Sequence, residues 1–464
     1  MRGCETRGVP DSPTATALSP DATAHLDDLA AFVVASPSSY HAAEEVARRA
    51  EAAGFVRLAE TDAWPAAGPD AGRYVVVRDG AAIAWTVPAG AAPTTPVTVL
   101  GTHTDSPGFK LKPRPTTRAH GWLQAGVEVY GGPLLNSWLD RELELAGRLA
   151  VRGSDGTVTE HLVRTGPMLR IPQLAIHLDR AVNDGLALDK QRHTQPVFGL
   201  ASPGVPGADE GADVVVALAE AAGVAADTVD GFDVVVADTQ PPRRFGARGA
   251  LFASGRLDNL LSTHAALTAL LSSADGDARV AGGDAPRIRV VAAFDHEELG
   301  SESRSGAAGP FLADVLDRVY AGLGASTEDR HRALAASWCV SSDVGHAVHP
   351  NYPERHDPAN HPVAGSGPIL KLNANQRYAS GATGSALWQA ACRSAGVPSQ
   401  AFVSNNAVPC GSTIGPITAT RLGIRTVDVG AAILSMHSAR ELCAAVDPWY
   451  LSRAMRAALD VVPT

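Results

Sequence analysis

The chain has 464 residues, 45% of them hydrophobic and 19% charged, which is typical of a globular protein with about two domains at ~150 residues each. Its formal net charge is −10 and no stripe of Lys and Arg is visible, so we expect no nucleic-acid partner. No apolar run reaches the ~18 residues that span a bilayer, so we expect no membrane span. The five cysteines are scattered and contain no CxxC pair, which favours a reducing cytoplasm over a disulfide framework.

The first elements follow a polar N-terminal segment. Residues 1–24 contain no apolar signal segment, and we predict a flexible leader there. The apolar spacing over 25–54 is helical, with a break near Pro37. Two short β-like runs and the run 96–105 come next. Helices and strands are therefore both expected in the first quarter of the chain.

The pattern of residues in the sequence changes at about residue 113. Turns that contain Gly and Pro separate short alternating strands up to about residue 246. A stretch rich in Ala and Asp, 203–230, lies inside this region. We predict that 113–246 is an inserted β-rich domain rather than a continuation of the first sheet.

Strand and helix patterns alternate again after residue 247. The expected elements are an amphipathic helix over 257–273, β-like runs over 287–294, 337–343 and 425–430, and a closing helical region over 438–462 that is interrupted at Pro448. This alternation predicts an α/β fold with a mostly parallel central sheet flanked by helices. We expect that domain to be discontinuous and to comprise 25–112 and 247–464.

Side chains that bind metal ions recur at the ends of these strands. His103 ends one β-like run, Glu297–Glu298 and Asp343 each follow another, and His437 lies a short loop beyond 425–430. In open α/β sheets, ligands bind outside the carboxyl ends of the strands, where residues far apart in sequence converge. The recurrence favours a metal site, although each motif alone has an ordinary structural explanation.

Two aspartates support a metal site at these positions. Asp105 lies two residues after His103 in an extended strand end, so its carboxylate can hydrogen-bond the far ring nitrogen and fix the tautomer. The alternative for this pair is a surface turn. Asp258 stands at the start of the expected helix. It is either an N-cap or a carboxylate that bridges two metals, and both can hold together.

Glu297 and Glu298 are adjacent acids after an apolar run, where two carboxylates repel each other unless a cation relieves the cost. One can bind a metal while the other takes a proton from water, whose pKa a metal lowers to roughly 7. The alternative is a solvated acidic turn. Two histidines and three carboxylates, with one spare acid, suit two divalent ions such as Zn²⁺, Mn²⁺ or Co²⁺.

Several stretches between about residues 100 and 445 resemble the M18 aspartyl aminopeptidases, in family order. They include GTHTDSPGFKLKP, SGRLDNLLS, AFDHEELGSESRSGA, SSDVGHAVHPNYPERH, GPILKLNANQRYAS and GIRTVDVGAAILSMHSARE. The leader has no match, and 203–230 diverges. The resemblance implies a two-metal aminopeptidase fold in which 113–246 serves as a dimerisation or lid domain.

The resemblance also implies a role for each residue of the site. The implied ligands of the two metals, with Asp258 shared between them, are His103 and Asp343 on one side and Glu298 and His437 on the other. Glu297 is the implied general acid/base. The peptide bond between Asp258 and Asn259 is expected to be cis.

Acidic peptides are the implied substrates. The family's substrate contacts fall on His177, His346, Lys371 and Tyr378. A cation such as Lys371 can form charge-assisted hydrogen bonds with the side chain of an N-terminal Asp or Glu. The apolar residues around Lys371 favour a partly buried cation that needs an anionic partner. The resemblance further implies a homo-oligomer, a tetrahedral dodecamer built from dimers, in which His177 reaches a neighbouring active site.

Two other functions stay open. The family also contains two-metal aminopeptidases with neutral, leucine-like specificity. A catalytically silent peptide-binding assembly is the second alternative. It would require a broken site, whereas every expected ligand and the expected base are present in this chain.

Overall fold

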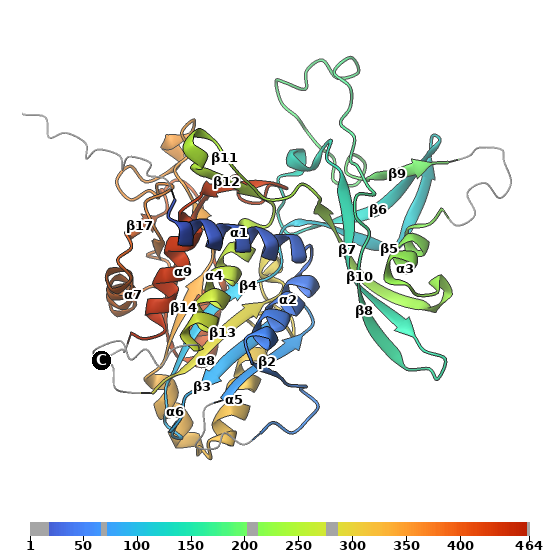
Figure 1. The fold of residues 1–464 in the computed structure, drawn as a ribbon. Helices are drawn as coiled ribbons and strands as arrows, with labels where there is room; N and C mark the ends of the chain where they lie inside the picture. The colour runs from blue at the N-terminus through green and yellow to red at the C-terminus, as the bar shows by residue number, and fades with distance from the viewer. Residues whose placement is uncertain (1–17, 66–71, 202–211, 275–285, 462–464) are drawn as a thin grey trace, which may run out of the picture.

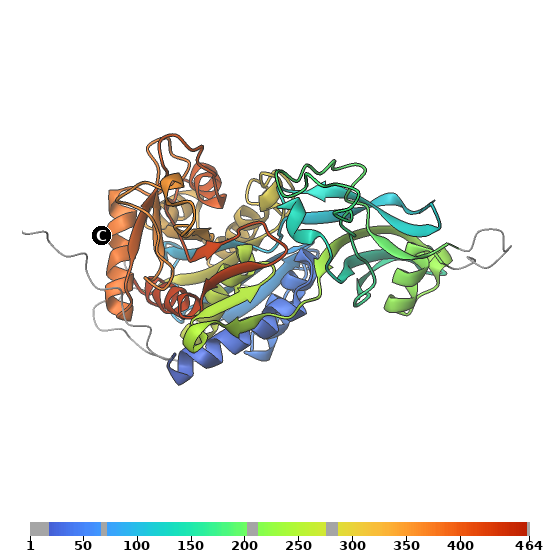
Figure 2. The same ribbon diagram turned by 90° about the horizontal axis from the view of Figure 1, so that it is seen from above.

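The computed structural model describes residues 18–65, 72–201, 212–274 and 286–461. Within these residues the strands form three sheets. Figures 1 and 2 show an elongated molecule, with the largest sheet and most helices at one end and the second sheet at the other. None of the described helices is long and apolar enough to cross a membrane.

The largest sheet has the strand order β1-β2-β3-β13-β4-β14-β18-β16-β17. Its strands are β1 (Val56–Arg57), β2 (Gly72–Arg78), β3 (Ala81–Val87), β4 (Val97–His103), β13 (Ile288–Phe294), β14 (Trp338–Ser342), β16 (Ile369–Leu372), β17 (Gln400–Val403) and β18 (Arg425–Gly430). Parallel pairing joins β13 to β4, β4 to β14 and β14 to β18. The carboxyl ends of these four strands therefore lie at one edge, and the predicted α/β fold is confirmed.

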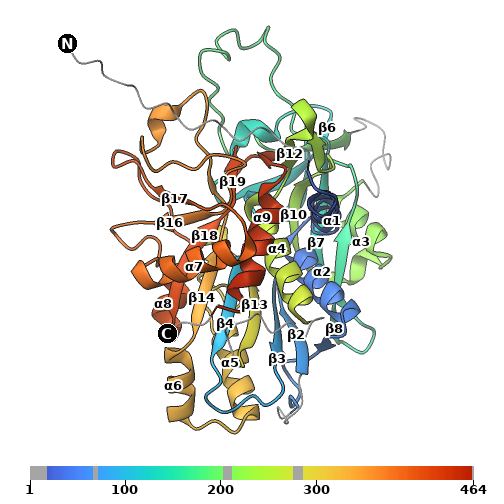
Figure 3. The same cartoon turned by 60° about the vertical axis from the view of Figure 1, so that its left-hand side comes forward.

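Helices cover both faces of this sheet (Figure 3). One face carries α1 (Pro20–Ala35), α2 (Ser39–Ala52), α4 (Leu257–Ala274), α7 (Ala382–Ala395) and α9 (Asp447–Ala458). The other carries α5 (Phe311–Gly322), α6 (Thr327–Ala335) and α8 (Ile414–Leu422). Successive strand side chains point to opposite faces, so Val290 joins one core and Val291 the other. This explains why apolar residues predominate on both faces of the central strands, as in β13.

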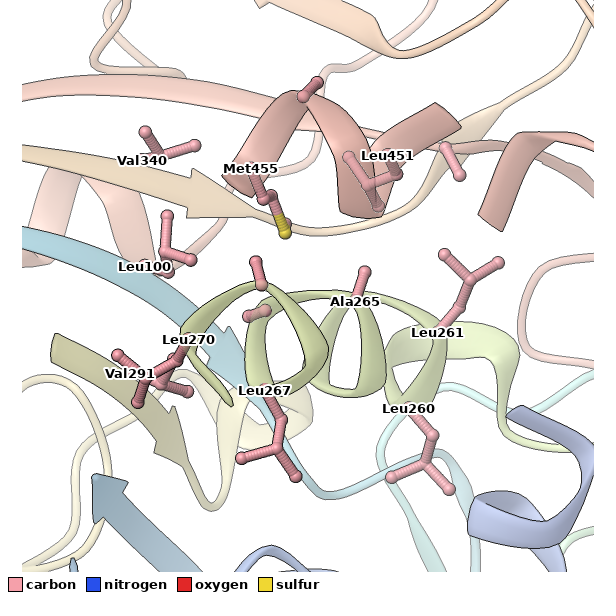
Figure 4. Close-up of a cluster of buried hydrophobic side chains, with 14 of the residues drawn as sticks. Leu100, Leu260, Leu261, Ala265, Leu267, Leu270, Val291, Val340, Leu451 and Met455 are labelled. Atoms are coloured by element: carbon pink, nitrogen blue, oxygen red, sulfur yellow. The ribbon is translucent and has the colours of Figure 1, made fainter. Parts of the chain in front are cut away.

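Helix α4 is the central helix of one of these cores. Leu260, Leu267 and Leu270 are at most 1% exposed. Figure 4 shows α4 packed against the strands and helix α9, whose Leu451 and Met455 face α4. Leu270 lies beside Val291, and Leu260 and Leu267 point away from α9. The leucines of the predicted amphipathic helix are thus buried on more than one side of α4. Because α4 is packed all round, the residues at its N-terminal end have a fixed place.

The second sheet has the order β8-β7-β10-β5-β6-β9. Its strands are β5 (Gly108–Ala119), β6 (Trp122–Tyr130), β7 (Leu143–Arg152), β8 (Val158–Arg164), β9 (Val197–Leu200) and β10 (Val229–Asp238), and α3 (Val214–Ala222) packs on it. It begins at Gly108, a little before the predicted boundary at 113. Part of the diverged stretch 203–230 lies outside the described residues.

The third sheet corrects one prediction. Its order is β11-β12-β20-β19-β15, and its strands are β11 (Arg243–Phe245), β12 (Leu251–Ser254), β15 (Gly345–His346), β19 (Ala432–Leu434) and β20 (Glu441–Ala444). The region 438–462 was predicted as one interrupted helix, but it contains β20 followed by α9. Pro448 lies in the first turn of α9, where an amide N–H has no helical partner to lose.

The N-terminal boundary also differs from the prediction. Helix α1 begins at Pro20, with Ser19 as its N-cap, so the predicted leader 1–24 overlaps the helix. Residues 1–17 lie outside the described residues. The expected break near Pro37 falls between α1 and α2. Short 3-10 helices complete the fold: η1 (Leu135–Trp138), η2 (Ala226–Thr228), η3 (Ala247–Gly249), η4 (Glu297–Leu299) and η5 (Pro353–Arg355).

Candidate metal centre

Three neighbouring parallel strands bring the predicted site residues together. His103 is the last residue of β4, η4 with Glu297 and Glu298 follows β13, and Asp343 follows β14. His103 is paired with Phe294 in the ladder between β4 and β13. The side chains therefore converge at the carboxyl edge of the sheet, where open α/β sheets bind their ligands.

The carboxylate of Asp258 lies between two histidines. Its Oδ1 is 3.3 Å from His103 Nε2, and its Oδ2 is 3.4 Å from His437 Nε2. Asp343 Oδ1 is 3.5 Å from the same His103 nitrogen, and Glu298 Oε2 is 3.5 Å from that of His437. The atoms form two groups that could each hold an ion and that share Asp258. The peptide bond after Asp258 is cis, as predicted.

The residues fit a pair of cations on independent grounds. Four of their buried atoms lack a hydrogen-bond partner among the described residues: His103 Nε2, Asp258 Oδ1, Glu298 Oε1 and Asp343 Oδ1. An unpartnered buried polar atom is costly, and a bound ion removes that cost. Imidazole nitrogens and carboxylate oxygens suit Zn²⁺. Asp258 Oδ1 accepts no hydrogen bond from the first turn of the helix, so this oxygen does not act as an N-cap.

The charges of the cluster are unfavourable without cations. Burial, together with the charges of Asp343 and Asp258, raises the pKa of Glu297 to about 8 against the opposing effect of His103. Burial and the charge of Asp258 raise the pKa of Glu298 well above its usual range. Positive ions beside these carboxylates would favour their ionised forms. The raised pKa values and the buried atoms without a hydrogen-bond partner therefore both indicate a site for cations.

Asp105 contacts His103 differently from the prediction. The ring nitrogen Nδ1 of His103 lies 3.0 Å from the backbone oxygen of Asp105 and 3.4 Å from its carboxylate oxygen Oδ1. The carboxylate mainly accepts hydrogen bonds from the backbone N–H groups of Glu297 at 3.0 Å and Glu298 at 3.2 Å. Asp105 thus holds the loop with the two acids as well as lying beside the histidine.

Three contributors to the site were not predicted. The hydroxyl of Tyr130, at the end of β6, donates to Asp105 Oδ2 at 2.9 Å. The carbonyl oxygen of Gly132 lies 3.0 Å from His437 Nδ1, and Glu441 accepts the backbone N–H of His437 at 2.8 Å. Tyr130 and Gly132 fall in the stretch VEVYGG, where neither residue is a usual metal ligand. A neighbouring acid in SMHSARE was the one available signal for Glu441.

The predicted substrate cation is buried next to a predicted ligand. Lys371 in β16 is 2% exposed. Its Nζ donates to the carbonyl oxygen of Val344 at 2.9 Å and to Asp343 Oδ2 at 3.4 Å. It also lies 5.4 Å from the ring centroid of Tyr378, which is buried. The anionic partner expected for a buried lysine is therefore present within the chain itself.

The two predicted histidine contacts are placed differently from each other. His346 in β15 is exposed and lies within electrostatic range of Lys371 and Asp343. His177 is exposed on the connection between β8 and β9. The structure brings His346 to the site, whereas His177 belongs to none of the groups of candidate ligands among the described residues.

This fold and these ligand groups are those of a metal-dependent hydrolase. A model of the family described as "Aminopeptidase I zinc metalloprotease (M18)" matches residues 32–457. The chain therefore belongs to the M18 family of metallo-aminopeptidases, which confirms the family predicted from its motifs.

Individual relatives agree with this assignment. The probable M18 family aminopeptidase 2 of Streptomyces avermitilis is 55% identical over 94% of this chain and 98% of its own length. That of Mycobacterium leprae is 42% identical over 93% and 97%. Among solved structures, Ape4 in its complex with Nbr1 is 36% identical with a TM-score of 0.89, over 94% of this chain and 85% of that one. The S. cerevisiae mApe1 dodecamer is 28% identical with a TM-score of 0.79, over 93% and 95%.

Proposed function

We propose that this aminopeptidase binds two divalent ions, most naturally Zn²⁺, and removes Asp or Glu from the N-termini of peptides, with Glu297 as the general acid/base. The main support is the pair of ligand groups that share Asp258. A third group, which includes Glu297, is also compact enough to hold an ion. Glu297 is assigned to catalysis because its side chain is 16% exposed, whereas that of Glu298 is 4% exposed.

The proposed reaction assigns a distinct task to each group. Bound divalent ions supply Lewis-acid polarisation of the scissile carbonyl and lower the pKa of water. Glu297 takes a proton from the attacking water and returns it to the leaving amine. Burial raises the pKa of Glu297 to about 8, and neighbouring cations lower it toward neutrality, where one group can both accept and return a proton.

Replacement of Glu297 tests its assigned role. Glu297→Gln keeps the shape of the side chain but removes the base, so kcat is expected to fall by about 100-fold or more. The zinc content of purified wild type and variant is measured alongside kcat. Two ions per chain in both proteins are expected. A variant that turns over at close to the wild-type rate would remove Glu297 from the mechanism.

Lys371 is the proposed partner of the substrate's acidic side chain, because an ammonium group forms strong charge-assisted bonds with carboxylates. A neutral, leucine-like specificity is the second candidate. It is favoured by one observation: the ammonium group is buried and already contacts Asp343 and Val344. On that alternative, Lys371 serves the ligand Asp343 and not the substrate.

A panel of Asp-, Glu- and Leu-derived chromogenic amides separates the two candidates. Lys371→Met should lower kcat/KM for the acidic substrates by at least about 10-fold more than for the leucine substrate, because one charge-assisted pair is worth roughly 1.5–3 kcal/mol. An equal loss on all three substrates would show that Lys371 acts through Asp343. A wild-type preference for the leucine substrate would establish the neutral specificity.

A homododecamer built from dimers is the proposed assembly. The printed description of the related S. cerevisiae protein is that of a dodecamer. Exposed Leu174, Ile176 and Leu178 surround His177, with 57%, 51% and 75% of their surfaces accessible. Such apolar exposure marks a contact surface. We propose that His177 reaches a neighbouring subunit's site there, and that the protein is cytoplasmic, since its described cysteines are free.

The assembly is tested by light scattering and by a charge on this loop. Leu178→Asp is expected to give smaller species and to lower kcat/KM with the metal content unchanged, because His177 then lacks a neighbour. Leu200→Asp is a matched control on a similarly exposed leucine, at 68%, outside the loop. A purified protein that holds less than one ion per chain and shows no peptidase activity after Zn²⁺ addition would instead support a catalytically silent peptide-binding assembly.

A further inference from the structure

One buried carboxylate holds the backbone of two candidate ligands. Glu441 lies in β20 and is 2% exposed. Its Oε2 accepts the backbone N–H of Asp258 at 3.0 Å, and its Oε1 accepts that of His437 at 2.8 Å. Asp258 is 183 positions away in the sequence, whereas His437 is four positions away. A single side chain thus joins two segments that the chain does not join directly.

Both oxygens of Glu441 act as acceptors in this arrangement, and hydrogen bonds of this kind to a carboxylate are charge-assisted. The position of Glu441 is fixed by its sheet, because β20 pairs with β12 and places Glu441 opposite Ser254. Strand β12 leads directly into the segment that carries Asp258. The carboxylate is therefore held in place before it accepts either hydrogen bond.

The loop that carries His437 needs such a contact. Ser435 has φ 58° and His437 has φ 66°, which is the left-handed region that residues with a Cβ rarely adopt. Conformations of this kind persist when surrounding contacts hold them. The hydrogen bond from the His437 backbone to Glu441 is one such contact, and the bond between its ring and Gly132 is another.

We propose that Glu441 is a positioning residue that sets the spacing between the Asp258 carboxylate and the His437 imidazole, and with it the affinity for the ion on the His437 side. This inference rests on the proposed two-ion centre. On the His103 side Glu441 holds only the shared Asp258, whereas His103 itself belongs to strand β4 and its carbonyl oxygen accepts the hydroxyl of Thr263 at 2.8 Å. Loss of Glu441 should therefore affect the two ions unequally.

The test compares Glu441→Gln with wild type as full-length enzymes, using Zn²⁺ titration against a competing chelator. A glutamine side chain has one acceptor oxygen, so one of the two backbone N–H groups loses its partner. Loss of a residue that orients a ligand typically weakens metal affinity about 10–100-fold. We expect that loss for one of the two binding steps and a much smaller change in the other.

Asp447→Asn is the matched control. Asp447 is also a buried carboxylate, 1% exposed, and it accepts the backbone N–H of Gly365 at 2.8 Å, but it contacts none of the candidate ligands. Its replacement is expected to lower the metal-free Tm and to leave both Zn²⁺ affinities unchanged. A purely structural role for Glu441 would give the same result as this control.

Two outcomes overturn the proposal: unchanged Zn²⁺ affinities in Glu441→Gln, or an equal weakening of both steps. If Glu441→Gln does not fold, Glu441→Asp decides in the same titration, because its shorter side chain keeps the charge but reaches one N–H less well. Unchanged affinities in that variant overturn the proposal too. A wild-type protein that binds a single ion would instead contradict the proposed two-ion centre.

Discussion

The carboxylates of this centre differ in what their oxygens contact. Asp258 Oδ1 and Asp343 Oδ1 are buried and accept no hydrogen bond among the described residues, which leaves them available to an ion. In Asp105 and Glu441, by contrast, both carboxylate oxygens accept hydrogen bonds from backbone N–H or hydroxyl groups. The hydrogen-bond partners thus separate candidate ligands from the groups that hold them. Residue type alone does not make this distinction.

Tyr130 offers a test of this residue-scale distinction. Tyr130→Phe removes the hydroxyl that donates to Asp105 Oδ2, so the loop with Glu297 is held less firmly. We expect kcat to fall about 10-fold, since a bond to a charged group is worth roughly 1.5–3 kcal/mol, with the metal content unchanged. Tyr320→Phe is the control, because that hydroxyl donates to the carbonyl oxygen of Thr95. Equal kcat in the two variants would exclude the positioning role.

Helix α4 connects the site to the core at the scale of an element. Asp258 lies in its first residues with φ −81° and ψ 100°, outside the helical range, while the leucines that follow are buried on several sides. The first turn can therefore leave regular helical geometry without loss of the packing that fixes the rest. The predicted helix was correct in extent, but its irregular start is a property of the site.

Truncation of a buried leucine in α4 tests this packing. Leu267→Ala should lower the free energy of unfolding by about 2–5 kcal/mol, because it removes transfer energy and leaves a cavity. Ser272→Ala, on an exposed position of the same helix, should change it by less than about 0.5 kcal/mol. Urea unfolding of both variants measures the difference. A similar effect of the two substitutions would show that α4 is less well packed than the structure indicates.

The largest sheet and the second sheet both contribute groups to the metal centre. The second sheet contributes the Tyr130 hydroxyl and the Gly132 carbonyl oxygen, and the backbone N–H of Leu134 donates to the carbonyl oxygen of His437 at 2.9 Å. The predicted inserted domain 113–246 is therefore in contact with the site as well as a proposed surface for assembly. A shift of the second sheet would move groups that hold His437 and Asp105.

The whole molecule should respond to pH in a defined direction when metal is removed. Burial and the charge of Asp258 raise the pKa of Glu441 to about 8, and burial with neighbouring charges raises the pKa of Glu297 to about 8. An unfolded glutamate titrates near ~4.3. Between about pH 5 and about pH 8 these two glutamates thus keep protons in the folded chain that they release in the unfolded chain, so their contribution lowers stability as pH rises.

The measurement is thermal unfolding in chelator across that range. Tm is expected to fall from about pH 6.5 toward about pH 8. Below about pH 6.5 the histidines His25 and His41, whose pKa burial lowers to about 3 and about 4, oppose the effect of the glutamates. Zn²⁺ addition should raise Tm most at the alkaline end, because the ligands are then free to bind without losing a proton. A metal-free Tm that increases between about pH 6.5 and about pH 8 would contradict the raised pKa values of the glutamates.

The sequence by itself determined the fold class and the candidate ligands. Apolar strands that alternate with helices in the sequence form a sheet whose two faces are covered by those helices. Because the strands are parallel, the residues that follow them, His103, Glu298 and Asp343, lie at one edge of the sheet. These features follow from local pattern and strand direction, which a single chain displays without its tertiary contacts. The separate roles of Glu297 and Glu298 in the proposed site came instead from the resemblance to the M18 family.

Only the tertiary structure decided which groups hold that site together. Glu441, Tyr130 and Gly132 act through hydrogen bonds to backbone atoms or to a second carboxylate, and such bonds depend on where distant segments meet. The burial of Lys371 against Asp343 is of the same kind. Residue types and spacing indicate which side chains can bind a metal, whereas packing decides which oxygen atoms remain free to do so.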